Sequence, residues 1–125
     1  MTTFSEAFNL EHDTSRGSIM QAIRGARLVL LTPDRWTQGA AARAADGLEL
    51  ESGADRRAVC WCLASAISLA RDKMGLHRHV FWDTCNALGY DGPDLTSWND
   101  DPDRTYEEVM DKLNETFLRL ENWKD

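Results

Sequence analysis

The stretch from Trp98 to Glu108 reads WNDDPDRTYEE and concentrates the side chains of this chain that are best suited to chemistry. A tryptophan precedes a dense run of carboxylates, and a proline and the start of a helix follow. Carboxylates can bind metal ions, transfer protons or dock cationic partners. With the earlier stretch WTQG, the candidate partner- or ligand-binding residues are Trp36, Gln38, Trp98, Asn99, Asp100, Asp101, Asp103, Arg104, Glu107 and Glu108.

A calcium loop is the first interpretation to test, because Asn99, Asp101 and Asp103 alternate like the first ligands of an EF-hand. Such a loop needs glycine at its sixth position and a bidentate glutamate at its twelfth. Those positions hold Arg104 and Met110. The sequence therefore excludes an EF-hand, and we expect neither a metal nor another cofactor here.

A structural role explains most of these residues one by one. Thr105 and Glu108 have the T-x-x-E spacing of a helix capping box. Carboxylates near a helix start interact favourably with the positive end of the helix dipole. Trp98 would then hold the loop against the core. Such a role does not explain why so many acidic residues are concentrated in this region.

The cysteines and histidines offer weaker sites. Cys60 and Cys62 fall in a segment predicted to be helical, where residues two apart point about 200° from each other and cannot share a metal. Cys60 as a nucleophile would have arginines nearby, but its apolar surroundings oppose a thiolate. We expect no catalytic residue, and whether the chain is an enzyme is left open, with a non-enzymatic role favoured. His79 and Asp83, four residues apart, predict a structural pair on one helix face.

The elements that must position these residues are predicted to be mainly α, in an irregular four-helix bundle around a buried central helix. That helix is expected over residues 55–74, with Asp55 as N-cap and Gly75 as C-cap, because its side chains are apolar or small nearly all round. Other helices are expected over 18–31, over 77–88 and from 105 onward, with a turn-rich loop over 89–103 and an alanine-rich turn or short helix closed by Gly47. The alternative is a small α+β fold with a short hairpin near 48–52. Residues 1–16 are expected as a loose arm, pinned in part by Phe4, Phe8 and Leu10, and 17–125 as a single helical domain.

Length and composition suit one soluble domain with its own core, since the chain has 125 residues, of which 42% are hydrophobic. No apolar run approaches the roughly 20 residues that a membrane span needs. The first residues lack a basic and apolar signal pattern, and three cysteines are an odd number. These features predict a cytoplasmic protein that does not bind membranes.

The net charge of −7 is unevenly distributed. Residues 79–125 carry twelve acids and four bases, whereas residues 16–78 carry ten bases and six acids. The acidic part should repel nucleic acid, and the basic part is too dilute to bind it. We therefore expect a basic protein partner and no direct nucleic-acid binding. Trp123 near the end of the chain suggests weak homo-oligomerisation.

Several short motifs follow one another in a recognisable order: W-x-Q-G at 36–39, A-D-G at 45–47, C-L-A-S-A-I at 62–67, W-N-D at 98–100 and R-T-x-E-E-V at 104–109. This order resembles a family of small bacterial and phage proteins classed only as a domain of unknown function, over residues 19–117. The family helix usually reads C-x-x-G-A-[IL], and Ser65 stands in place of that glycine. The resemblance implies a small helical cytoplasmic fold without an assigned activity. It also implies that Trp36, Gln38, Trp98, Asn99, Asp100, Arg104 and Thr105 form one shared site or one packing lock, held by an Arg104–Asp100 ion pair.

Three functions remain open on these grounds. The first is an acidic interaction module that docks a basic partner through the C-terminal acidic face, with Trp82 and Trp98 as anchors. The second is a phage or mobile-element inhibitor of the anti-CRISPR or anti-restriction type, which occupies the nucleic-acid-binding surface of a defence nuclease. The third is a small ligand-binding domain or enzyme with a pocket formed by Trp, Gln and Asp side chains.

Overall fold

The computed structural model describes residues 2–124 as six α-helices, one 3-10 turn and a small sheet. The fold is mainly α, as the sequence predicts, and it has a small β part, which the sequence predicts only as the alternative fold. The helices are α1 (Phe4–Ala7), α2 (Arg16–Val29), α3 (Leu63–Met74), α4 (His79–Ala87), α5 (Gly92–Asn99) and α6 (Tyr106–Glu121). The 3-10 turn is η1 (Pro33–Arg35), and the strands are β1 (Ala42–Ala44), β2 (Glu49–Leu50) and β3 (Ala58–Trp61).

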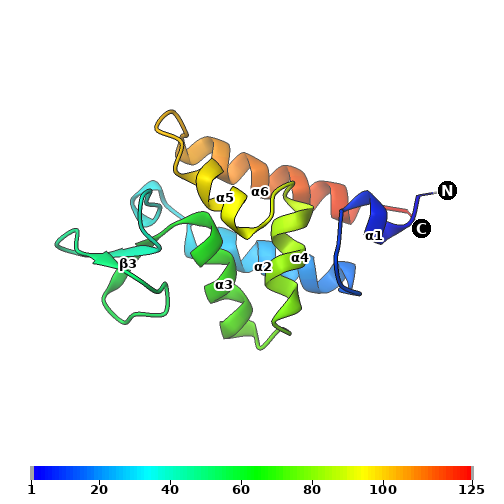
Figure 1. Ribbon diagram of the computed structural model, residues 1–125, viewed down its shortest axis with the longest axis horizontal. Helices are drawn as coiled ribbons and strands as arrows, with labels where there is room; N and C mark the ends of the chain where they lie inside the picture. Colours follow the sequence, from blue (N-terminus) through cyan, green and yellow to red (C-terminus); the bar gives the residue numbers. More distant parts are fainter. Residues whose placement is uncertain (1, 125) are drawn as a thin grey trace.

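The helices pack around α2, which contacts α3, α4 and α6, while α3 also contacts α4 and α5. The α2 face that carries Ile19 and Ile23 is fully buried, because these residues recur at helical spacing. Leu113 and Leu120 of α6 cover it from one side, and Leu63 lies in the same core cluster. Figure 1 shows α6 lying along α2, and in both views the sheet lies at one end of the molecule and the two termini at the other.

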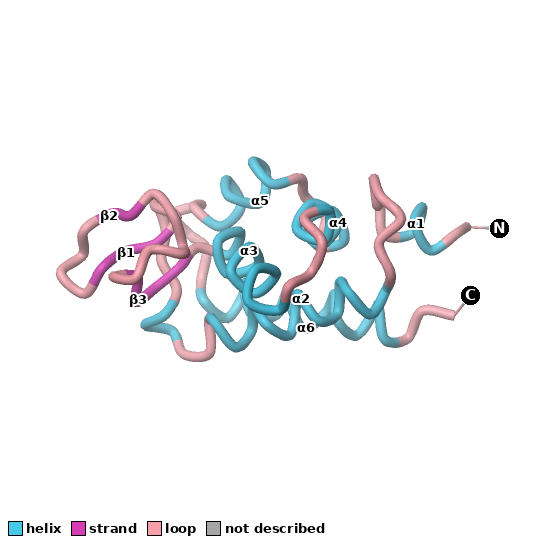
Figure 2. The backbone as a smooth tube through the Cα atoms, turned by 90° about the horizontal axis from the view of Figure 1, so that it is seen from below, coloured by secondary structure: helices cyan, strands magenta, loops and turns pink. Residues whose placement is uncertain are grey.

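The sheet is antiparallel with strand order β2-β1-β3 (Figure 2). Ala42 of β1 pairs with Leu50 on one side and with Trp61 on the other. Gly47, with φ of +88°, lies in the turn that joins β1 to β2. The hairpin expected near 48–52 is therefore present, with its first strand upstream in residues that the sequence predicts as an alanine-rich turn or short helix.

The predicted helix over 55–74 is wrong over residues 55–62. Residues 58–61 form β3, and α3 begins only at Leu63, because Cys62 has extended backbone and acts as the N-cap. Asp55 does not cap a helix; its carboxylate accepts hydrogen bonds from the backbone and side chain of Arg57 and fixes a turn. Those bonds lower the pKa of Asp55 to about 2. The predicted C-cap is confirmed, since Gly75 is left-handed with φ of +65°.

The predicted loop over 89–103 is also wrong, because α5 occupies its middle. Asp91 is the N-cap and accepts a hydrogen bond from the backbone of Asp94, and Pro93 lies in the first turn. A proline there costs no hydrogen bond. Near its end this helix carries Trp98, which is half-buried against the core, and Asn99, which is fully buried.

The N-terminal segment, expected as a loose arm, packs on the helical body. Phe8 is buried at 3% exposure, and Phe4 and Leu10 pack against the same core. Phe4 and Phe8 also lie against the ring of Trp123, which is half-buried. Trp123 is thus part of the contact between the two ends of the chain.

Candidate functional site

The site predicted around the WTQG and WND motifs is assembled where α5 ends. Asn99 is the last residue of α5, and Asp100 is its C-cap. A turn then leads to α6, whose first residues form the predicted capping box between Thr105 and Glu108. The backbone amide of Thr105 is the main cause that lowers the pKa of Glu108. Two helix ends therefore converge on one short loop.

Asn99 is fully buried and has all its polar positions engaged. Its Oδ1 accepts from the indole Nε1 of Trp36 at 2.7 Å and from the backbone N of Leu63 at 3.1 Å. Its Nδ2 donates to the carbonyl of Thr37 at 3.2 Å and to Oδ1 of Asp100 at 2.9 Å. An amide has two donors and two main acceptor directions, so this side chain has no capacity left for a ligand.

The segment from Trp36 to Gly39 runs beside the end of α5 and makes three more hydrogen bonds to residues 99–101. Nε2 of Gln38 donates to the carbonyls of Asn99 at 2.9 Å and Asp101 at 2.7 Å. The backbone N of Gly39 donates to Oδ1 of Asp100 at 3.0 Å. We call Trp36, Gln38, Asn99 and Asp100 the Asn99 cluster. It joins the approach to the sheet, the start of α3 and the end of α5.

Trp98 and Arg104 form a second group beside this cluster. The Arg104 guanidinium carbon lies 3.9 Å from the centre of the Trp98 ring, and Nε donates to the Trp98 carbonyl at 2.9 Å. Lys112 approaches the same ring at 5.2 Å. Trp98 is thus half-buried beneath two cations, where cation–π attraction holds it.

The expected Arg104–Asp100 ion pair is wrong. Arg104 pairs instead with Glu108 at 3.2 Å and with Asp101 at 3.9 Å, because Asp100 is turned toward Gly39 and Asn99. The structure therefore divides the predicted residues into three sets. Trp36, Gln38, Asn99, Asp100 and the backbone of Asp101 join in one network; Trp98, Arg104 and Glu108 join in the adjacent group; Asp103 and Glu107 are exposed.

The exposed face of α6 carries carboxylates that the sequence reasoning did not single out as a row. Glu107, Asp111 and Glu115 follow one another at intervals of four residues, and all three are exposed. We call them the acidic stripe. In the described part of the chain none of them makes an ion pair, because Arg104 and Lys112 are engaged over Trp98. The sequence could have revealed this stripe, because residues four apart lie on the same face of a helix.

The histidines also gather in a way that the sequence did not predict. His12 stacks on His79 with ring centres 3.9 Å apart, and His77 meets His79 edge-on at 4.2 Å. The expected His79–Asp83 pair is replaced, because fully buried Asp83 accepts hydrogen bonds from the backbone N of Glu11, the backbone N of His12 and the hydroxyl of Thr14. Asp83 thus fastens the N-terminal segment to α4.

The cysteines lie apart from these groups. Cys60 is in β3, and the Cys62 sulfur accepts from the backbone of Ser65 at the start of α3. Burial raises the pKa of Cys85 to about 12, which keeps it a thiol at neutral pH. Within residues 2–124, no three His, Cys, Asp or Glu side chains are arranged to hold a metal ion. None of the helices described in that range combines the length and apolar character needed to cross a membrane.

The chain matches the model of a protein family. The model of a family described as "Family of unknown function (DUF6197)" matches residues 14–117. No curated protein and no solved structure matches the chain.

Proposed function

The chain belongs to this family of unknown function, and on that premise we propose that it is a non-enzymatic interaction module that docks a basic partner protein through its C-terminal acidic face. The observation that carries the proposal is the acidic stripe, Glu107, Asp111 and Glu115, on the exposed side of α6. Each four-residue pair of like charges costs the helix about 0.2–0.5 kcal/mol. A cationic partner surface would offset that cost, so the stripe is suited to binding.

The contacts that Asn99 and Trp98 make within the fold favour binding through the exposed surface over binding in a pocket beside these residues. The polar atoms of Asn99 are used within the fold, and Trp98 is covered by Arg104 and Lys112. Leu118 lies on α6 three residues after Glu115, the last residue of the stripe. Its side chain is 54% exposed and offers an apolar contact beside the charges. Interfaces commonly combine an apolar centre with a charged rim.

The inhibitor of a defence nuclease is a narrower version of the same proposal. The acidic stripe has three carboxylates on one straight helix, whereas a DNA duplex carries one charge per about 1.7 Å of its axis on two winding strands. Three carboxylates imitate only a short part of such a charge array, which favours an ordinary basic protein surface as the partner.

The test is capture of partners from a native lysate at low and at high salt with two matched variants. One variant neutralises the stripe through Glu107→Gln, Asp111→Asn and Glu115→Gln. Wild type should retain a basic protein at low salt and lose it at high salt, because salt screens exposed charges. The stripe variant should not retain it. Capture that the stripe variant leaves unchanged would overturn the proposal.

The control variant removes the same charge elsewhere, through Glu11→Gln, Asp13→Asn and Glu51→Gln, all exposed positions outside α6. It should bind like wild type. Equal loss in both triple variants would mean that total charge and not the α6 face matters. Competition by duplex DNA for the captured protein would identify the nuclease-inhibitor version.

A small ligand-binding role is the second candidate, and one hollow favours it. About 240 Å³ of space lies beside the Asn99 cluster, lined among others by Gly39, Cys62, Ser65 and Asp100. Asp100→Asn tests this role in a metabolite thermal-shift screen, because Asp100 lines the hollow and Trp98 does not. Loss of a ligand-induced shift with unchanged basal stability would favour the pocket, whereas loss of stability alone would assign Asp100 to the fold.

A further inference from the structure

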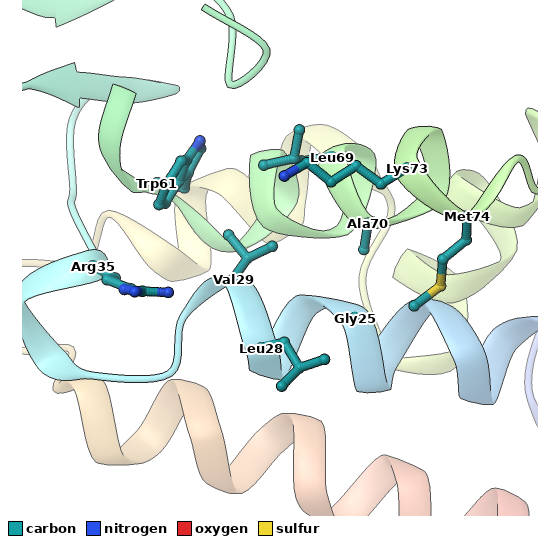
Figure 3. A pocket seen from close by; sticks show the side chains of 9 residues that line it. All are labelled: Gly25, Leu28, Val29, Arg35, Trp61, Leu69, Ala70, Lys73 and Met74. Atoms are coloured by element: carbon teal, nitrogen blue, oxygen red, sulfur yellow. The ribbon is translucent and has the colours of Figure 1, made fainter. Parts of the chain in front are cut away.

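A hollow of about 270 Å³ lies on another face of the molecule, between α2 and α3. Figure 3 shows Trp61 and Arg35 at one end and Met74 at the other, with Gly25 between the helices. The floor is tight, because a Cβ on Gly25 would come within 2.6 Å of the Ala70 Cβ. The two helices therefore meet at the floor, and the space above is bounded by longer side chains.

The walls of this hollow are apolar and partly fixed in place. Leu28 and Met74 are 58% and 41% exposed. Val29 and Leu69 lie between Trp61 and Met74 (Figure 3). The indole Nε1 of Trp61 is bonded to the carbonyl of Gly53 at 2.9 Å, which holds the ring as an end wall. Exposed apolar side chains that gather around one concavity are typical of binding sites.

The charges at the hollow are of one sign, and they are basic. Arg35 comes from η1 and Lys73 from α3, and Figure 3 shows the Lys73 side chain extending toward the Trp61 end. Neither forms an ion pair within residues 2–124, and none of the described lining residues is acidic. Asp34 accepts from Thr32, and Asp72 pairs with Arg71. In a chain of net charge −7, two unpaired cations over an apolar surface select for an anion.

We propose that the α2–α3 hollow binds a small amphiphilic carboxylate, with its hydrocarbon chain between Leu28, Leu69 and Met74 and its carboxylate between Arg35 and Lys73. The volume suits one short acyl chain and is below the range of drug-sized pockets. The two lining cations supply positive charge for one carboxylate head, and the apolar walls match the tail. This site shares no residue with the acidic stripe, so the proposal stands independently of the docking function.

The test is an NMR titration of the full chain with decanoate, decanol and decyltrimethylammonium as probes. Decanoate should shift, in a saturable manner, the amides of Gly25 and Ala70 and the indole N–H of Trp61. Octanoate should bind more weakly, by at most about fourfold per methylene removed. Decanol should bind several-fold more weakly than decanoate, and the cationic probe should not compete.

Variants distinguish a specific binding site from nonspecific binding of hydrophobic probes. Arg35→Gln with Lys73→Gln should weaken decanoate binding about three- to tenfold, as expected for two exposed charge contacts, and leave decanol binding unchanged. The matched control, Arg56→Gln with Arg78→Gln, removes the same charge at exposed positions outside the hollow and should bind decanoate like wild type. Equal binding of the cationic probe, shifts scattered over the surface, or equal weakening in both double variants would overturn the proposal.

Discussion

Replacing Asn99 with alanine should remove the bonds that join three parts of the fold. The backbone N–H of Leu63 would lose its partner in the buried interior, which costs about 1–3 kcal/mol. Trp36, Thr37 and Asp100 are half-buried, so water can replace part of what they lose, and each bond costs about 0.5–1 kcal/mol. The sum predicts a loss of about 2.5–6 kcal/mol in the free energy of unfolding.

Urea unfolding monitored by tryptophan fluorescence measures this loss, with the slope checked to show that the unfolding remains two-state. Asn114→Ala is the matched control. Asn114 is exposed on α6 and accepts one bond, from Arg27 at 2.9 Å, so its truncation should change stability by less than about 1 kcal/mol. An Asn99→Ala variant within about 1 kcal/mol of wild type would refute the assignment of Asn99 as the lock.

Asn99→Asp adds a pH-dependent test of the same reasoning. The introduced carboxyl keeps the acceptor toward Trp36 but loses both donors and lies against Asp100. Burial and the neighbouring carboxylate raise the folded-state pKa of such a group above its unfolded value of about 3.9. The variant should therefore be closest to wild type below that pH and lose stability as the pH rises through the folded-state pKa. A stability difference that does not vary between pH 4 and pH 7 would contradict this mechanism.

Three further predictions concern other parts of the molecule. Gly25→Ala should destabilise the protein by about 1–3 kcal/mol in urea unfolding, because its Cβ would meet the Ala70 Cβ at 2.6 Å; Gly17→Ala on the same helix meets nothing within 4 Å and should be neutral or stabilising by up to about 1 kcal/mol. Asp111→Gln should stabilise by about 0.4–1 kcal/mol, because it removes two like-charge pairs of the acidic stripe. His79 should titrate below its ordinary pKa of 6.5 in an NMR pH series, because burial and the adjacent histidines disfavour its charged form.

The lowered pKa of His79 makes the stability of the protein depend on pH in a defined direction. A histidine whose folded-state pKa is lowered binds fewer protons in the native state than in the unfolded state. Its contribution is complete above the unfolded pKa near 6.5 and is lost as the pH falls below it, and His79→Gln should flatten that decline. A His79 pKa at or above 6.5 would contradict the titration prediction. The glycine prediction would be wrong if both variants cost the same stability, and the stripe prediction would be wrong if Asp111→Gln lost stability.

Local signals allowed part of the fold to be predicted from sequence. The capping box of Thr105 and Glu108 and the left-handed Gly75 depend on neighbouring residues alone, and both are confirmed. The start of α5 was equally local, since Asp91 precedes a glycine, a proline and Asp94. It was missed because the same residues are also typical of turns.

Long-range pairing explains the remaining errors. Residues 58–61 read as part of an apolar helix, but they gain their partners from β1, whose Ala42 and Arg43 lie far upstream. Asn99 carries no local mark of burial, because its partners come from residues 36, 37 and 63. The resemblance to the family implied that WTQG and WND meet as one site or one packing lock. Only the geometry shows that hydrogen bonds within the fold occupy every polar position of the Asn99 side chain.

The distinction between a lock and a surface decides where function should be sought. Asn99 ties together the ends of α5, α3 and the approach to the sheet, and a side chain with all its bonds made inside the fold contributes stability and not recognition. Two groups of charged side chains without an ion pair among the described residues lie elsewhere: the acidic stripe on α6, and the cations Arg35 and Lys73 beside an apolar hollow. Because the two surfaces carry opposite charge on different elements, neutralising one should leave binding at the other intact. The stripe variant should retain wild-type affinity for decanoate, and the Arg35→Gln with Lys73→Gln variant should still capture the basic partner. These two results together would establish the acidic stripe and the α2–α3 hollow as separate sites.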